Sequence, residues 1–170
     1  MTDWTTPRTW QTGDLVTADD LNGELRDRML WLHSRRPAVT LFEFTTSYGT
    51  SSTAFVPFDP PISITMETHG LPLMIGLNCY VQLPYRQGVG FRYKIDGVVP
   101  TGHTDGNGRW LLNYGESINR NESISIMSWL PNVAPGTHTF TLEWRAQQSG
   151  QGTVSVYSSQ NIGQFYLVEI

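Results

Sequence analysis

The sequence predicts a mainly β domain, an antiparallel sandwich or barrel, preceded by an extended arm and one α-helix. From residue 39 onward, apolar and polar residues alternate with a period of two, which is typical of strands with one face in a core. Turn-forming residues separate roughly nine such runs, a spacing that favours a sandwich or barrel. Charged residues make up only 15% of the 170 residues, so polar uncharged residues fill the turns and outward faces.

Residues 1–16 are predicted to form an arm without regular secondary structure. Trp4 and Trp10 follow neither a helical nor a strand period. Each indole has about 150–250 Å² to bury, and so short a segment has no core of its own. The arm either folds back on the β domain or docks on another subunit, and we favour docking.

Residues 17–36 are predicted to form the one helix. Thr17 is placed to cap its N-terminus, with Asp20 at the third helical position, close to a capping box. Arg35 and Arg36 match the negative end of the helix dipole, and Pro37 ends the helix.

One narrow apolar stripe runs along this predicted helix. It consists of Leu21, Leu25, Met29 and Leu32, at spacings of four, four and three residues. The stripe packs either on the chain's own domain or against copies of itself, and the length of barely three heptads favours neither alternative.

Three runs predict half-buried strands most clearly: Leu71–Leu83, Val89–Ile95 and Phe140–Trp144. Further strands are predicted at Thr40–Thr45, Ile62–Thr68, Arg109–Tyr114, Ser123–Leu130, Thr153–Tyr157 and Gln164–Ile170. Turn chemistry separates the strands, as at Asp96-Gly97 and Pro135-Gly136.

Two of these strands depart from simple alternation. After Ile126 the apolar positions shift to Met127 and Trp129, which predicts a β-bulge near Ile126. The last strand carries apolar groups on both faces, which predicts a subunit interface or a deeply central strand. These interface residues are Phe165, Tyr166, Leu167, Val168 and Ile170.

The sequence offers no motif for catalysis, a cofactor or a metal ion. Cys79 is the single cysteine, and none of the four histidines is spaced as a metal pair. A pair of acidic residues for glycan cleavage is the least favoured alternative, with Asp96, Asp105, Glu116 and Glu122 as the candidates. We therefore expect a non-enzymatic protein with no catalytic, cofactor or metal site.

Charge and hydropathy limit the partners. The net charge of −4 argues against nucleic acid, and the apolar runs are too short for membrane insertion. Four aromatic residues outside the main pattern would suit a carbohydrate-stacking platform, although core positions are favoured for them. They are Trp110, Tyr114, Trp129 and Tyr157.

The N-terminal segment resembles the opening of structural proteins of tailed bacteriophages. The matching residues are Trp4-Thr5-Thr6-Pro7-Arg8-Thr9-Trp10, then Gly13-Asp14-Leu15-Val16-Thr17-Ala18 with Leu21-Asn22, and then Leu25-Arg26-Asp27. Arg28 stands where an Asn is common. The C-terminal part, from Pro135-Gly136 to Trp144 and from Phe165 to Ile170, is similar to phage jelly-roll domains and, in outline, to trimeric complement-C1q or tumour-necrosis-factor-type domains.

The resemblance implies a virion structural protein assembled in the host cytoplasm. Residues 1–36 would anchor or oligomerise the chain, and residues 37–170 would form a jelly-roll-like β-sandwich projecting as a homotrimer. The expected partners are copies of the chain, other capsid or tail proteins, and a host surface glycan. A tail-associated role is favoured over capsid decoration, and a carbohydrate-binding module is the alternative of another class.

Overall fold

The structure, a computed structural model, describes residues 11–13, 15, 17–26, 29, 39–100, 109–113, 119–131, 133–157 and 162–170. The chain divides into two compact units, Met1–Pro37 and Ala38–Ile170. Each unit is described by itself.

The first unit contains the predicted helix start. α1 (Ala18–Leu21) continues into one π-helical turn, η1 (Asn22–Arg26). The predicted capping box is present, because the Thr17 hydroxyl accepts from the Asp20 backbone N–H at 3.2 Å and the Asp20 carboxylate accepts from the Thr17 backbone N–H at 3.1 Å. The later part of the predicted helix lies outside the described residues except for Met29. Within the described residues, no helix is long and apolar enough to cross a membrane.

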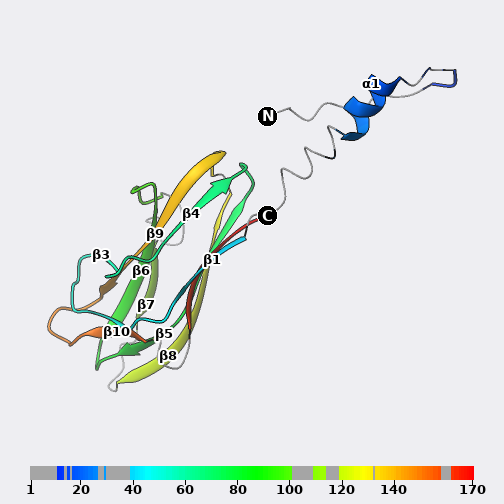
Figure 1. Cartoon of the computed structure of the whole chain (residues 1–170). Helices are drawn as coiled ribbons and strands as arrows, with labels where there is room; N and C mark the ends of the chain where they lie inside the picture. The colour runs from blue at the N-terminus through cyan, green and yellow to red at the C-terminus, as the bar shows by residue number, and fades with distance from the viewer. Residues whose placement is uncertain are drawn as a thin grey trace. The chain divides into compact units, whose positions relative to one another are not determined.

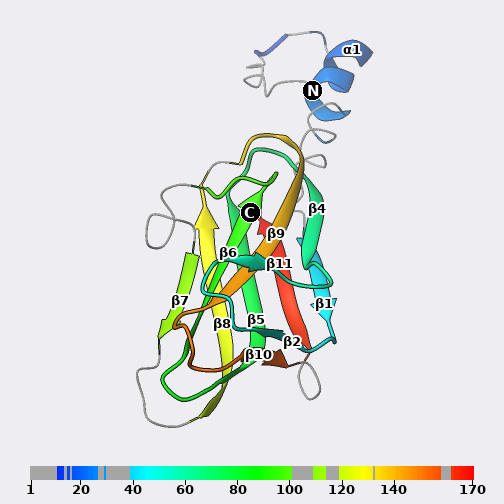
Figure 2. The ribbon, with the colours of Figure 1, turned by 90° about the vertical axis from the view of Figure 1, so that its left-hand side faces the viewer.

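The second unit is the predicted jelly-roll-like β-sandwich, with two sheets facing one another (Figure 1). Sheet A contains β1 (Val39–Phe44), β2 (Tyr48–Thr50), β5 (Leu73–Leu83), β8 (Arg120–Leu130), β10 (Val154–Tyr157) and β11 (Gly163–Glu169). Sheet B, which faces the viewer in Figure 2, contains β3 (Val56–Pro57), β4 (Ser63–Thr68), β6 (Gly88–Ile95), β7 (Arg109–Asn113) and β9 (Gly136–Ala146).

β5 is the central strand of sheet A. β8 pairs with it along its full length, while β11 and β10 share its other side, one after the other. β1 pairs with the outer side of β11. The last strand therefore lies inside the sheet, one of the two alternatives that its apolar composition left open.

The inward residues of the two sheets form one continuous core. The alternation predicted for Leu71–Leu83 is confirmed, because Leu73, Ile75, Leu77, Cys79, Val81 and Leu83 are all buried. Phe58 stacks on Trp144 of β9, with ring centroids 4.7 Å apart, and meets the edge of Tyr48 at 4.9 Å. Tyr48 begins β2, and Phe58 directly follows β3; the sequence predicted neither of these two short strands.

The predicted bulge in β8 is wrong. β8 pairs with β5 in an unbroken register from Leu73 opposite Leu130 to Leu83 opposite Arg120. Ser128, and not its apolar neighbours, takes the inward position, where its hydroxyl lies 3.5 Å from the Tyr93 hydroxyl. A buried hydroxyl with a partner is cheap to accommodate, so the strand alternates regularly and Met127 and Trp129 face outward.

Candidate interaction surface

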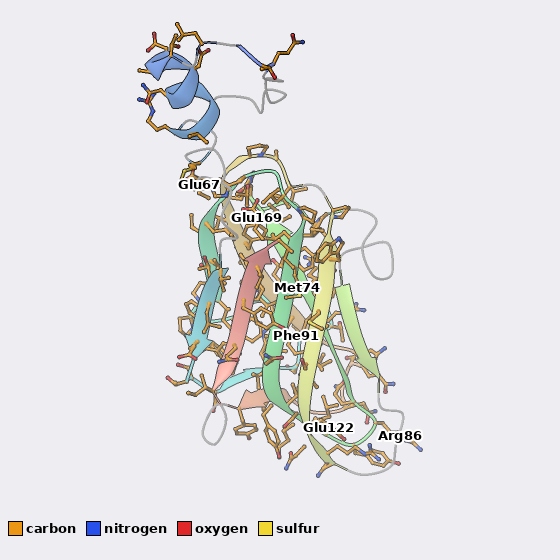
Figure 3. All side chains as sticks on the ribbon, turned by 90° about the vertical axis from the view of Figure 1, so that its right-hand side faces the viewer. Glu67, Met74, Arg86, Phe91, Glu122 and Glu169 are labelled. Carbon is orange, nitrogen blue, oxygen red and sulfur yellow. The ribbon has the colours of Figure 1, made fainter. Side chains whose placement is uncertain are left out.

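The outer face of sheet A carries two neighbouring rows of apolar side chains at one end. In the first row, Val168 pairs with Val39 on one side and with Met74 on the other, and Met74 pairs with Trp129. Paired residues of antiparallel strands lie on the same face, so these four side chains form one line across four strands. Figure 3 looks onto this face, with Met74 labelled on β5.

The second row lies one step further along the strands. Leu41 pairs with Tyr166, Tyr166 with Gly76, and Gly76 with Met127. A Cβ at position 76 would overlap the Tyr166 ring, so the ring lies directly over the glycine. Glycine at this position lets an aromatic ring lie flat on the sheet.

We call these residues, with Ile170, the apolar half of sheet A. Its large exposed members are Val39 at 67%, Leu41 at 49%, Met127 at 61%, Trp129 at 48% and Ile170 at 53% of their full accessible surface. Single exposed apolar residues are ordinary, but a contiguous group across four strands makes this face a candidate interaction surface.

The described side chains on the outer face of sheet B are mainly polar or charged. Glu143 accepts from Arg92 Nε at 2.6 Å and from Lys94 Nζ at 2.7 Å. The guanidinium groups of Arg92 and Arg145 lie 4.4 and 4.8 Å from the ring centroid of Phe55. These two cations cover the Phe55 ring. Among the described side chains, the outer face of sheet A is therefore the better candidate for a contact surface.

A buried carboxylate fixes the end of β11 beside the apolar half. Glu169 accepts from the backbone N–H groups of His69 and Leu71 at 2.6 and 3.1 Å, and its other oxygen lies 2.8 Å from His69 Nδ1. Burial alone would raise the pKa of the Glu169 carboxyl, but these hydrogen bonds outweigh it and hold the pKa below its usual value. Glu169 thereby ties the end of β11 to the β4–β5 turn.

A second histidine–carboxylate pair joins the β6 turn to β9. Asp96 Oδ2 lies 2.6 Å from His138 Nδ1, and the Ala134 carbonyl lies 2.9 Å from Nε2. Both partners accept hydrogen bonds, which favours the imidazolium and raises the pKa of His138; a backbone N–H from Thr139 and the bond to His138 lower the pKa of Asp96. With both ring nitrogens engaged, His138 has none left to exchange a proton with a substrate.

Reactive groups elsewhere in the described residues are few. Burial raises the pKa of the Cys79 thiol, so it stays a protonated core residue. Among the described residues, no group of three or more His, Cys, Asp or Glu side chains is placed to hold a metal ion.

The structure separates the residues predicted for an interface strand. Phe165 and Leu167 point into the core, whereas Tyr166, Val168 and Ile170 belong to the apolar half. The core position favoured for Trp129 is wrong, since the indole is half-exposed.

The helical stripe is described only in part. Leu25 and Met29 are exposed in the first unit, and Leu21 lies at the end of α1. The predicted anchoring residues Trp4, Trp10 and Leu32 lie outside the described residues, as do Tyr114 and the side chain of Trp110.

Sequence reasoning missed Val39, Leu41, Met74 and Met127 as members of one surface. Strict alternation through Ser128 would have found Met127, but only the order of the strands brings β1, β11, β5 and β8 together.

No protein-family model and no curated protein sequence matches this chain.

Proposed function

We propose that this chain is a non-enzymatic structural protein of a tailed-bacteriophage virion, self-associating as a trimer and anchored to the particle by residues 1–36. The observation that carries the proposal is the apolar half of sheet A, which faces away from the chain's own core. The resemblance of the N-terminal segment to phage structural proteins supports the particle as the setting. A tail-associated position is preferred, with capsid decoration as the alternative.

The energetics favour contact with copies of the chain. Burying a large apolar side chain fully contributes about 1.5–3 kcal/mol, so five half-exposed ones offer several kcal/mol per copy. Association costs at least about 4 kcal/mol in lost freedom, so this surface alone supports only modest affinity. A ring of copies held together at their N-terminal segments raises the effective concentration at these surfaces.

The first test is the oligomeric state of the full chain. We expect the wild type to be an oligomer at micromolar concentration, and the double variant Met127→Ser/Trp129→Ser to weaken association at least tenfold. Light scattering coupled to size exclusion measures both. Val98→Ser, which removes an equally exposed side chain from the β6 turn, is the matched control and leaves the mass unchanged. A wild type of 19.2 kDa in solution contradicts self-association through sheet A.

The second test concerns anchoring. We expect a chain lacking residues 1–16 to keep near-native melting of the β-sandwich, because the core lies within Ala38–Ile170, but to be lost from virions. The truncated protein is supplied to a phage that lacks the gene, and purified particles are assayed for it. Normal incorporation refutes the anchoring role, and loss of folding places the arm in the domain core.

One observation favours the second candidate, a carbohydrate-binding module. Trp129 is half-exposed, as a sugar-stacking residue needs to be. Its cross-strand partner is Met74, and its neighbour on the same face of β8 is Met127, so its nearest described neighbours on this face are two thioether side chains. A sugar site needs placed polar groups as well as a ring. The surroundings of Trp129 therefore favour protein contact.

A further inference from the structure

The other end of the same sheet face has a different chemistry. Beyond the apolar half, β5 presents Asn78, Tyr80 and Gln82 outward, and the strands beside it add tyrosine, serine and amide side chains. We call this surface the polar half of sheet A. Its members are Asn78, Tyr80, Gln82, Asn121, Ser123, Ser125, Ser155, Tyr157 and Gln164.

We propose that the polar half of sheet A binds a neutral glycan. The pairing of Tyr80 with Tyr157 across β5 and β10 places two half-buried tyrosines side by side, with Ser123 opposite Tyr80 on the next strand. Sugar rings have apolar faces of C–H groups and rims of hydroxyl groups. Tyrosine side chains supply a surface for the former and a polar tip for the latter.

Amide groups beside the tyrosines are free to bind hydroxyls. Tyr157 donates its hydroxyl hydrogen to Gln82 Oε1 at 2.9 Å, which orients the Gln82 amide and leaves its nitrogen without a partner among the described residues. Asn121, opposite Gln82, is exposed. The side-chain oxygen of Asn78 is buried and lacks a donor in the described part of the chain. Rotation of that amide toward a sugar hydroxyl would satisfy it.

The charges around this surface select a neutral ligand. The carboxylate at its border, Glu43, accepts from Gln164 Nε2 at 3.1 Å. Arg120 takes the inward parity of β8 and is paired with Glu122, 3.3 Å away. Within the described residues, the polar half itself contains no cationic side chain, and the exposed guanidinium of Arg86 in the β5–β6 turn lies over the Tyr85 ring, 4.9 Å from its centroid.

A second copy of the chain fits this half less well than it fits the apolar half. Protein interfaces place polar groups at the rim and are depleted of serine, whereas this surface has serine and amide groups throughout. A glycan offers the matching hydroxyl groups. The inference goes beyond the proposed role in assembly and uses residues separate from the self-association surface.

The test uses the full chain and neutral oligosaccharides of glucose, mannose and galactose, with dextran sulfate as the charged probe. Binding is read from chemical-shift changes of the protein amides. We expect at least one neutral oligosaccharide to bind and to shift amides of Tyr80, Gln82 and Tyr157. Tyr80→Ala and Asn121→Ala should each weaken binding at least tenfold, and the exposed position of Asn121 keeps the test valid should Tyr80→Ala unfold the domain.

Light scattering on the same samples separates this inference from the proposed assembly. Met127→Ser/Trp129→Ser should dissociate the oligomer while glycan-induced shifts at Tyr80 persist, and Asn121→Ala should do the reverse. Three results would overturn the inference: no neutral oligosaccharide binds at millimolar concentration, dextran sulfate alone binds, or Asn121→Ala dissociates the oligomer with glycan binding intact. None of these results bears on incorporation into particles.

Discussion

Replacing Gln87 with leucine should destabilise the β-sandwich by about 3–5 kcal/mol, because it removes four hydrogen bonds between a fully buried side chain and backbone groups. Gln87 is fully buried in the β5–β6 turn. Its Oε1 accepts from the backbone N–H groups of Gly88, Gln147 and Gln148 at 3.1, 3.1 and 2.8 Å, and its Nε2 donates to the Gln148 carbonyl at 2.8 Å. Three of these four bonds join the β5–β6 turn to Gln147 and Gln148, just after β9.

Thermal unfolding followed by circular dichroism measures this effect, and a domain of this size should lose about 10 °C in Tm or more. Gln148→Leu is the matched control, since its exposed side chain is removed while its backbone bonds to Gln87 stay. The control should change stability by less than about 0.5 kcal/mol. Equal effects of the two substitutions would show that the Gln87 bonds contribute nothing.

Replacing Glu169 with leucine should cost about 2–3 kcal/mol at neutral pH, as three hydrogen bonds to a carboxylate with no exposed surface are lost. The effect should depend on pH with a definite sign. Because the folded pKa of Glu169 lies below its usual value, the carboxylate stabilises the fold above the unfolded-state pKa, and this stabilisation is lost as the pH falls through the folded pKa. The wild type and Glu169→Leu should therefore converge in acid.

Urea unfolding at a series of pH values from neutral to strongly acidic measures the difference. Glu67→Leu is the control, since Glu67 is exposed on β4, near the same turn (Figure 3). We expect it to be nearly neutral at every pH. A Glu169→Leu difference that is constant with pH would assign the loss to packing and not to the carboxylate.

The long strands were predictable because apolar inward residues and polar outward residues alternate along much of their sequence. Gly88–Ile95 and Gly136–Ala146 show the buried and half-buried pattern that the sequence indicates, and Asp96-Gly97 forms the predicted tight turn with positive φ at both residues. β2 and β3 were missed, since runs of three and two residues are too short for a period to be visible.

The interaction surface was not predictable from any one segment. The apolar half assembles residues of β1, β11, β5 and β8, whose order in the sheet a single sequence does not reveal. The bulge was predicted because apolar side chains were expected to point inward. Met127 and Trp129 contradict that rule, because both side chains are exposed on the outer face of the sheet.

The pairing of β1 with β11 has a consequence for how the domain forms. β1 pairs along its whole length with β11, a strand roughly 120 residues further along the chain, and contacts so distant in sequence slow folding. β1 therefore cannot join sheet A until β11 (Gly163–Glu169), which lies between β1 and β5, has left the ribosome. Because the apolar half spans both strands, it is assembled only in that final step. Nascent chains therefore lack the complete apolar half, so the order of synthesis should delay the proposed self-association until β11 has been made.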